Sequence, residues 1–367
     1  MKLGQKLIIT YIFIFFLTLL VPVIGIFIGI TSKTDNTERR ALAKFPHLNK
    51  LPLQQYPKAF DSFWNDNFGF RNWFLDMYTG VKEGIFKSPP TPWYDTRGKD
   101  GWLFINPVSP NDYVGFYKHI EFSETELEAV KNKFLAEKNW LKARNIDYMI
   151  VIVPDKDVIY PEYYPYPNHL LFNIGLEQFI NYFKKNTDID IVYLKNAIMN
   201  GKKSTILPLY YKTDTHWNNL GTFFGYQDVM KQVKKYYPNV DILNVDDFDI
   251  TKVDSAGNSV GDLIRIDSHF IKSPEEKISM KLKDDSAKRI VKLSKVFMYG
   301  DSFSVNPNGS LLEGLNLFLR FNFNDVVESN YGYQLDFDEI EKAKPELVIR
   351  ESVQRNIHDW VKLTDIK

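Results

Sequence analysis

The clearest pattern in the chain is an N-terminal run of apolar positions that no charged residue interrupts. The run extends from Leu7 to Ile30, and Lys2 and Lys6 precede it. A helix of about 20 apolar residues spans a bilayer, whereas the apolar core of a secretory signal peptide is shorter. No Ala-x-Ala cleavage pattern follows. We therefore expect residues 1–30 to form an uncleaved transmembrane signal anchor, with a cleaved signal peptide as the alternative.

Further along, segments with helical spacing alternate with short, continuously apolar segments. Residues 123–144 predict an amphipathic helix, because Leu127, Val130 and Phe134 recur on one face and the Ser-x-x-Glu start at 123–126 is a capping box. Two more helices are expected at 176–185 and 218–236. The expected strands lie at 146–153, 188–194, 296–299 and 345–352. Such alternation predicts a mostly parallel sheet with helices on both faces.

The same patterns divide the chain into three parts. Residues 31–94 are polar at first and then dense in aromatics, with Gly69 as an interruption, so we expect a stalk and docking segment behind the anchor. Residues 95–367 are expected to form one α/β domain. Within it, 240–290 is polar and shows little periodicity.

Charge and composition narrow the functional classes. Of the 367 residues, 46 are Lys or Arg and 46 are Asp or Glu, so no global field attracts the chain to nucleic acid. Lys2 and Lys6 favour a cytoplasmic N-terminus, although Lys33 and Arg39 on the other side weaken this bias. The chain has no cysteine, so export would require no disulfide formation. We expect a single-pass protein of the cell membrane whose residues 31–367 are extracytoplasmic.

Ser302 is the first candidate for chemistry. It lies just after the carboxyl end of the predicted strand at 296–299. In open parallel sheets, functional residues gather at this edge. Gly300 permits a tight turn or an unusual φ, and a helix starting just after Ser302 would aim N–H groups at a developing oxyanion. The alternative is that Asp301 and Ser302 form only a helix cap or an Asx turn.

His216 is the candidate base for that serine. A histidine titrates near neutral pH and can remove the hydroxyl proton, provided that a carboxylate holds its other ring nitrogen. Asp214 lies two residues earlier, and in extended backbone the two side chains point the same way. The alternative is a loop aspartate that caps the next helix beside a structural histidine. Asp267 and His269 repeat the spacing, so His269 is a competing base.

No cofactor or metal is indicated. The sequence contains no His-x-x-x-His or His-Glu-x-x-His pattern and no glycine-rich nucleotide loop. Three further residues are candidates for substrate contact: Trp217 as a platform for sugar rings, Lys156 at the end of a strand, and Arg320. For Trp217, as for Trp93 and Tyr299, the alternative is core packing, and for Arg320 it is a surface position at the end of a helix.

Several stretches together resemble a known family. "GDSFS" at 300–304 is similar to the serine block of SGNH hydrolases, and "DTHW" at 214–217 is similar to their Asp/His block. The blocks stand in reversed order, which resembles the AlgX/AlgJ-like (DHHW) polysaccharide O-acetyltransferases. "ERRALAKFP", "FDSFWNDNFGFRN", "GKDGWLF", "VPDKDVIYPEYYP", "VGDL" and "KPELVIRESVQRN" fit as well, from about residue 36 to 356.

The resemblance implies a circularly permuted, SGNH-hydrolase-like three-layer fold in which Ser302 is the nucleophile, His216 the general base and Asp214 its orienter. It also implies transfer of acetyl groups to hydroxyls of an exported or cell-surface polysaccharide, with the donor supplied by a multi-pass membrane O-acyltransferase. Two alternatives stay open. One is a carbohydrate esterase that uses the same triad. The other is a non-catalytic, polysaccharide-binding scaffold of the acetylation complex.

Overall fold

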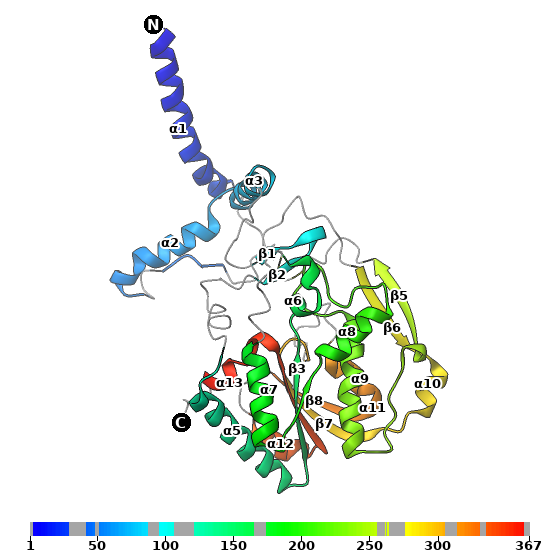
Figure 1. Cartoon of the computed structure of the whole chain (residues 1–367). Helices are drawn as coiled ribbons and strands as arrows, with labels where there is room; N and C mark the ends of the chain where they lie inside the picture. The colour runs from blue at the N-terminus through cyan, green and yellow to red at the C-terminus, as the bar shows by residue number, and fades with distance from the viewer. Residues whose placement is uncertain are drawn as a thin grey trace. The chain divides into compact units, whose positions relative to one another are not determined.

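The structure is a computed structural model, and it describes residues 3–28, 42–47, 51–86, 95–105, 121–164, 174–254, 261, 263, 276–304, 314–330 and 335–362. It comprises two compact units (Figure 1). The described residues up to Phe86 belong to the first unit, and those from Asp95 onward belong to the second. The division into anchor, stalk and catalytic domain stays a prediction.

The first unit is helical. It contains α1 (Leu3–Phe27), the short 3-10 helix η1 (Leu53–Gln55), α2 (Tyr56–Asn67) and α3 (Arg71–Gly84). Residues 4–26 of α1 are long and apolar enough to cross a membrane. The interruption expected at Gly69 is confirmed, since it lies between α2 and α3.

A five-stranded sheet forms the centre of the second unit. Its strands are β3 (Asp147–Val153), β4 (Asp190–Tyr193), β7 (Leu293–Gly300), β8 (Phe323–Asn330) and β9 (Leu347–Val353). They are arranged in the order β4-β3-β9-β7-β8, and every pair is parallel. The mostly parallel sheet is therefore confirmed. Consecutive residues of a strand face opposite sides, so continuously apolar strands such as β3 require a cover on both faces.

Helices provide that cover as two layers (Figure 1). One side carries α5 (Glu124–Lys142), α7 (Ile174–Asn186), α12 (Phe337–Ala343) and α13 (Asp359–Lys362), whereas α8 (Lys195–Ser204), α9 (Asn219–Tyr236) and α11 (Leu315–Asn322) lie on the other. Strand β3 alternates between the layers: Ile150 packs with α5 and α7, and Val151 packs with α9. The result is the predicted three-layer architecture.

Local signals in the sequence account for several helix ends. Ser123 caps α5, with the Glu126 N–H donating to its Oγ and its own N–H donating to Glu126, so the predicted capping box is confirmed. Helix α9 begins after Asn218, whose side chain accepts from the N–H groups of Leu220 and Gly221. These contacts satisfy donors that a helix start otherwise leaves open.

Small elements complete the second unit. Strands β1 (Asp95–Arg97) and β2 (Leu103–Ile105) form an antiparallel pair, as do β5 (Phe248–Asp254) and β6 (Glu276–Leu282). The other short helices are η2 (Lys99–Gly101), α6 (Lys156–Ile159), η3 (Pro161–Tyr163), η5 (Val245–Asp247), α10 (Asp284–Arg289) and η6 (Gln354–Asn356). The β5–β6 pair lies in the region that lacked periodicity, because its residues are largely polar and mixed.

Candidate active site

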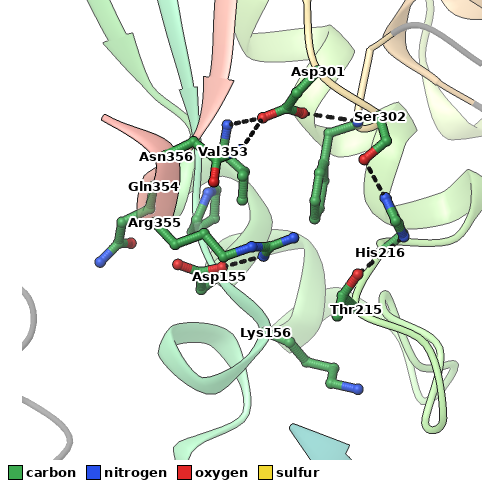
Figure 2. A network of polar contacts seen from close by, with 12 residues as sticks. Asp155, Lys156, Thr215, His216, Asp301, Ser302, Val353, Gln354, Arg355 and Asn356 are labelled. Atoms are coloured by element: carbon green, nitrogen blue, oxygen red, sulfur yellow. Dashed lines mark hydrogen bonds and ion pairs between the residues drawn. The ribbon is translucent and has the colours of Figure 1, made fainter. Parts of the chain in front are cut away.

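Three adjacent strands end at the same edge of the sheet and bring polar residues together (Figure 2). Ser302 follows β7, Asp155 and Lys156 follow β3, and Arg355 follows β9. Because these strands are parallel neighbours, their carboxyl ends meet, which is where open α/β sheets place their sites. The loop before α9 supplies His216 from the side.

Residues 302–304 form a turn that Asp301 anchors. The Asp301 carboxylate accepts hydrogen bonds from the N–H of Phe303 at 3.0 Å, from the N–H of Val353 at the end of β9 at 2.8 Å, and from Nδ2 of Asn356 in η6 at 3.2 Å. The Asx turn considered from the sequence is therefore present, but Asp301 makes it. A helix directly after Ser302 was expected, whereas a turn follows, and 305–313 lie outside the described residues.

Gly300 is required by close packing rather than by an unusual φ. It does not have a positive φ, and a Cβ placed on it would lie 2.6 Å from Oε2 of Glu351. Glu351 is buried in β9, and its Oε2 accepts from the N–H of Asp301 at 3.1 Å. Burial, and then the charge of Asp301, raise the pKa of Glu351 well above its usual range. This carboxyl therefore lies directly behind the Ser302 turn, in surroundings that favour its neutral form.

His216 is held in a short loop. Tyr210 and Trp217 form a β-bridge, and the N–H of Tyr211 donates to the carbonyl of His216. Asp214 Oδ1 accepts the N–H of His216 at 3.0 Å. Extended backbone was expected here, but the chain bends over 212–216, and the Asp214 carboxylate still reaches the imidazole. The helix cap is Asn218, not Asp214.

Ser302, His216 and Asp214 form a continuous hydrogen-bonded chain. The distance from Ser302 Oγ to His216 Nε2 is 2.6 Å, and the distance from His216 Nδ1 to Asp214 Oδ1 is also 2.6 Å. In neutral histidine, Nδ1–H then donates to the carboxylate and Nε2 accepts from the hydroxyl. Thr215 Oγ1 lies 3.1 Å from Nδ1, and the Phe303 ring packs against the imidazole at 4.5 Å between centroids. His216 and Asp214 are buried, whereas Ser302 is partly exposed.

Lys156 braces the loop that carries the histidine. Its Nζ donates to the carbonyl oxygens of Tyr211 at 3.1 Å, Lys212 at 3.0 Å and Asp214 at 2.7 Å. Three carbonyls on one ammonium fix the loop relative to the end of β3. From the other side, the N–H of Leu263, in the "VGDL" stretch, donates to the carbonyl of Thr213.

A small pocket with both polar and apolar lining adjoins this loop, and the space within it, including the part open to solvent, is about 260 Å³. The lining residues are Phe104, Ile105, Asp155, Lys156, Asp157, Thr215 and Arg355. Nη1 of Arg355 donates to Asp155 Oδ1 at 2.5 Å, so the pair ties β3 to the end of β9 (Figure 2). Burial raises the pKa of Asp155, although Arg355 opposes the shift. Burial and the charge of Asp155 raise the pKa of Asp157 to about 7.

The family model described as "SGNH hydrolase-like domain, acetyltransferase AlgX" matches residues 96–351, well over half of the chain. The chain belongs to this family. The fold class expected from the sequence is thereby confirmed, together with the family resemblance. The matched residues include the serine turn and the histidine loop.

Three solved structures that are similar to this chain share little sequence with it. The O-acetyltransferase domain of Pseudomonas putida AlgJ is 20% identical, with 74% of this chain and 98% of that one covered and a TM-score of 0.48. Bacillus cereus PatB1 is 17% identical, with coverages of 71% and 97% and a TM-score of 0.45. Pseudomonas aeruginosa AlgX is 14% identical, with coverages of 76% and 64% and a TM-score of 0.43. No curated protein matches the chain in sequence.

The other residues suggested by the sequence have different positions. The Trp217 side chain is 1% exposed, and its Nε1 donates to the carbonyl of Phe303 at 3.2 Å, so it connects the histidine loop to the serine turn. Arg320 is exposed at the end of α11 and pairs with Glu328. His269 and Trp93 lie outside the described residues. Among the described residues, Arg320 bonds to Glu328 rather than to the triad, and Lys156 has protein carbonyls as partners.

Asp301, Glu351, Asp155 and Arg355 were not recognised as site residues from the sequence. A usable signal existed for the last two, because "VPDK" and "SVQRN" both follow apolar strands, as Ser302 does. Glu351 could not be recognised in this way, since it lies within a strand. Among the described residues, no group of three or more His, Cys, Asp or Glu side chains is arranged to hold a metal ion.

Proposed function

We propose that the protein is a serine O-acetyltransferase that adds acetyl groups to hydroxyls of an exported or cell-surface polysaccharide. The observation that supports this most directly is the chain of two 2.6 Å hydrogen bonds from Ser302 through His216 to Asp214. Membership of an acetyltransferase family supports acetyl as the group that is transferred. Helix α1, which is long and apolar enough to span a membrane, supports a location of the protein at the membrane. The polysaccharide acceptor and a multi-pass membrane O-acyltransferase as the source of acetyl groups rest on the family resemblance.

In the first half-reaction, His216 Nε2 accepts the proton of Ser302 as Oγ attacks the acetyl carbonyl of the donor. The donor oxygen or sulfur then leaves with that proton, and an acetyl ester of Ser302 remains. Asp214 keeps Nδ1 protonated and stabilises the imidazolium that forms. The N–H of Ser302 has no acceptor among the described residues, so we assign it to the developing oxyanion.

In the second half-reaction, a sugar hydroxyl replaces the donor. His216 Nε2 accepts the hydroxyl proton, the sugar oxygen attacks the acetyl ester, and Ser302 Oγ leaves with the proton. We propose that the pocket beside the loop binds the acceptor, because Asp155, Asp157 and Arg355 provide both hydrogen-bond donors and acceptors for sugar hydroxyls. Its position next to Thr215 would place the acceptor near the base.

The roles of Trp217 and Lys156 follow from their contacts. We propose that both are positioning residues rather than the substrate contacts expected from the sequence, since Trp217 is covered by protein and the Lys156 ammonium binds three loop carbonyls. Correct placement of His216 relative to Ser302 depends on them. A displacement of about 1 Å at a reacting group costs on the order of a hundredfold in rate.

The test uses the full chain in detergent with 4-nitrophenyl acetate as the acetyl donor. We expect a burst of nitrophenolate, an acetyl group on Ser302 by mass spectrometry, and transfer to an added oligosaccharide from a panel. Ser302→Ala and His216→Ala should abolish all three. The matched control is Ser304→Ala, because Ser304 lies in the same turn but is 0% exposed, whereas Ser302 is the serine that bonds to His216.

Three results would contradict the proposal. Acetate release that no oligosaccharide in the panel diverts would indicate an esterase on the same triad. Acetylation of the polysaccharide in cells carrying Ser302→Ala, at a normal protein level, would indicate a non-catalytic scaffold. Acetylation of another residue in the burst would rule out Ser302 as the nucleophile.

A further inference from the structure

Helix α3 carries an apolar stripe that the protein leaves exposed. Trp73, Met77 and Val81 recur every four residues, and Ile85 continues the series at the helix end. Their exposed fractions are 58%, 50%, 41% and 71%, and Tyr78 beside them is also exposed. A contiguous apolar surface that is exposed to water is unusual and marks a binding surface.

The stripe is separated from the charged residues of the helix. At about 100° per residue, Trp73, Met77, Val81, Ile85 and the neighbouring Tyr78 fall within an arc of roughly 140°. Helical spacing places all four charged residues of 71–84 outside that arc. The stripe therefore forms an apolar face that carries no charged residue.

The start of α3 is joined to the C-terminal end of α1. The N–H of Gly69 donates to the carbonyl of Pro22 at 3.0 Å. A Cβ on Gly69 would lie 2.5 Å from the Cα of Gly25, and a Cβ on Gly25 would lie 2.8 Å from the Cα of Gly69. The two backbones thus touch, and only glycine fits at either position. The apolar segment of α1 ends at Ile26, within one turn of this contact.

Helix α3 also crosses the direction of α1. Figure 1 shows α1 from the side and α3 end-on, next to the C-terminal end of α1. If α1 spans a bilayer, its C-terminal turn lies where the hydrocarbon meets the headgroups. A helix that crosses it there runs along the membrane surface.

We propose that α3 is an interfacial helix whose stripe, Trp73, Met77, Val81 and Ile85, is buried in the lipid at the membrane–water boundary. Lipid is the occupant that the observations favour, because the stripe is continuous with a membrane-spanning helix and combines aliphatic residues with Trp and Tyr, which are enriched at this depth. The helix would hold the end of α1 at a fixed depth. This inference depends on α1 spanning the membrane and is independent of the acetyl-transfer chemistry.

The absence of cysteine makes a direct test possible, since an introduced thiol is the only one in the chain. The full chain carrying Met77→Cys or Val81→Cys is labelled with a nitroxide and inserted into phosphatidylcholine–phosphatidylglycerol nanodiscs. Lys82→Cys, outside the stripe on α3, and Lys231→Cys, exposed on α9, are the controls. Relaxation of the spin label by oxygen and by a water-soluble nickel chelate then reports its depth.

We expect the labels at 77 and 81 to be relaxed by oxygen and protected from nickel, at a depth of about 5–10 Å, and the labels at 82 and 231 to be open to nickel. Labels at 77 and 81 that nickel reaches as readily as at 231 would overturn the proposal. So would labels at 77 and 81 that neither reagent reaches, because that result would indicate protein rather than lipid on the stripe.

Discussion

Glu351→Gln should make the stability of the catalytic unit less dependent on pH. Glu351 is 3% exposed, and its Oε2 accepts the N–H of Asp301. Asp301 is the nearest charge and is negative. The cations on β9 and just after it are engaged elsewhere: Arg350 points to the opposite face and pairs with Glu137, and Arg355 pairs with Asp155.

The sign and size of the effect follow from proton binding. Burial and Asp301 raise the pKa of Glu351, so the folded protein retains a proton that the unfolded chain releases above the usual glutamate pKa. The free energy of unfolding therefore falls as pH rises from that usual value toward the folded-state pKa, by up to about 1.4 kcal/mol per pH unit. Glutamine keeps an acceptor for the Asp301 N–H and does not titrate. For a unit of this size, the difference corresponds to about 3–6 °C in Tm per pH unit.

The assay is thermal unfolding of the detergent-solubilised full chain between about pH 5.5 and pH 7.5, above the usual glutamate pKa. The wild-type Tm should fall relative to that of Glu351→Gln as pH rises, so that the variant becomes relatively more stable. Glu341→Gln is the control, because Glu341 is half-exposed and pairs with Arg144 at the surface. Parallel Tm curves for the wild type and Glu351→Gln would refute the reasoning and show that the Glu351 carboxyl is ionised in the folded protein.

Three other predictions concern residues around the triad and beneath the sheet. Lys156→Met removes three hydrogen bonds from the histidine loop, so the burst rate with 4-nitrophenyl acetate should fall at least about tenfold, and Lys156→Arg should restore part of it. Glu137→Gln breaks the buried pair with Arg350 on the face away from the triad; it should lower the free energy of unfolding by about 3–5 kcal/mol in denaturant titrations, with the burst rate per folded molecule unchanged. As pH rises through about 7, Asp157 ionises and adds a negative charge to the pocket, so the KM for the oligosaccharide acceptor should vary with pH between about 6 and 8, and Asp157→Asn should flatten that profile.

The elements of the fold could be predicted largely from the sequence because their signals are local. The capping box at Ser123, the apolar run of β3 and the cap at Asn218 each act within a few residues. Strand β8 was not predicted, since "FNDVVESN" mixes polar and apolar positions at the edge of the sheet. The β5–β6 pair was missed for a similar reason.

The sequence by itself also determined that Asp214 and His216 lie close together, because only one residue separates them, and that Ser302 follows a buried strand. Only the tertiary structure decided that His216 reaches Ser302, which lies 86 residues away, and that Lys156 binds the loop rather than standing free. It alone placed Glu351 behind the nucleophile, because that position requires β9 to pair with β7. The physical reason is the distance along the chain over which the interactions act. Helix caps and hydrophobic periodicity depend on neighbouring residues, whereas the site depends on the order of the strands in the sheet, which brings distant residues together.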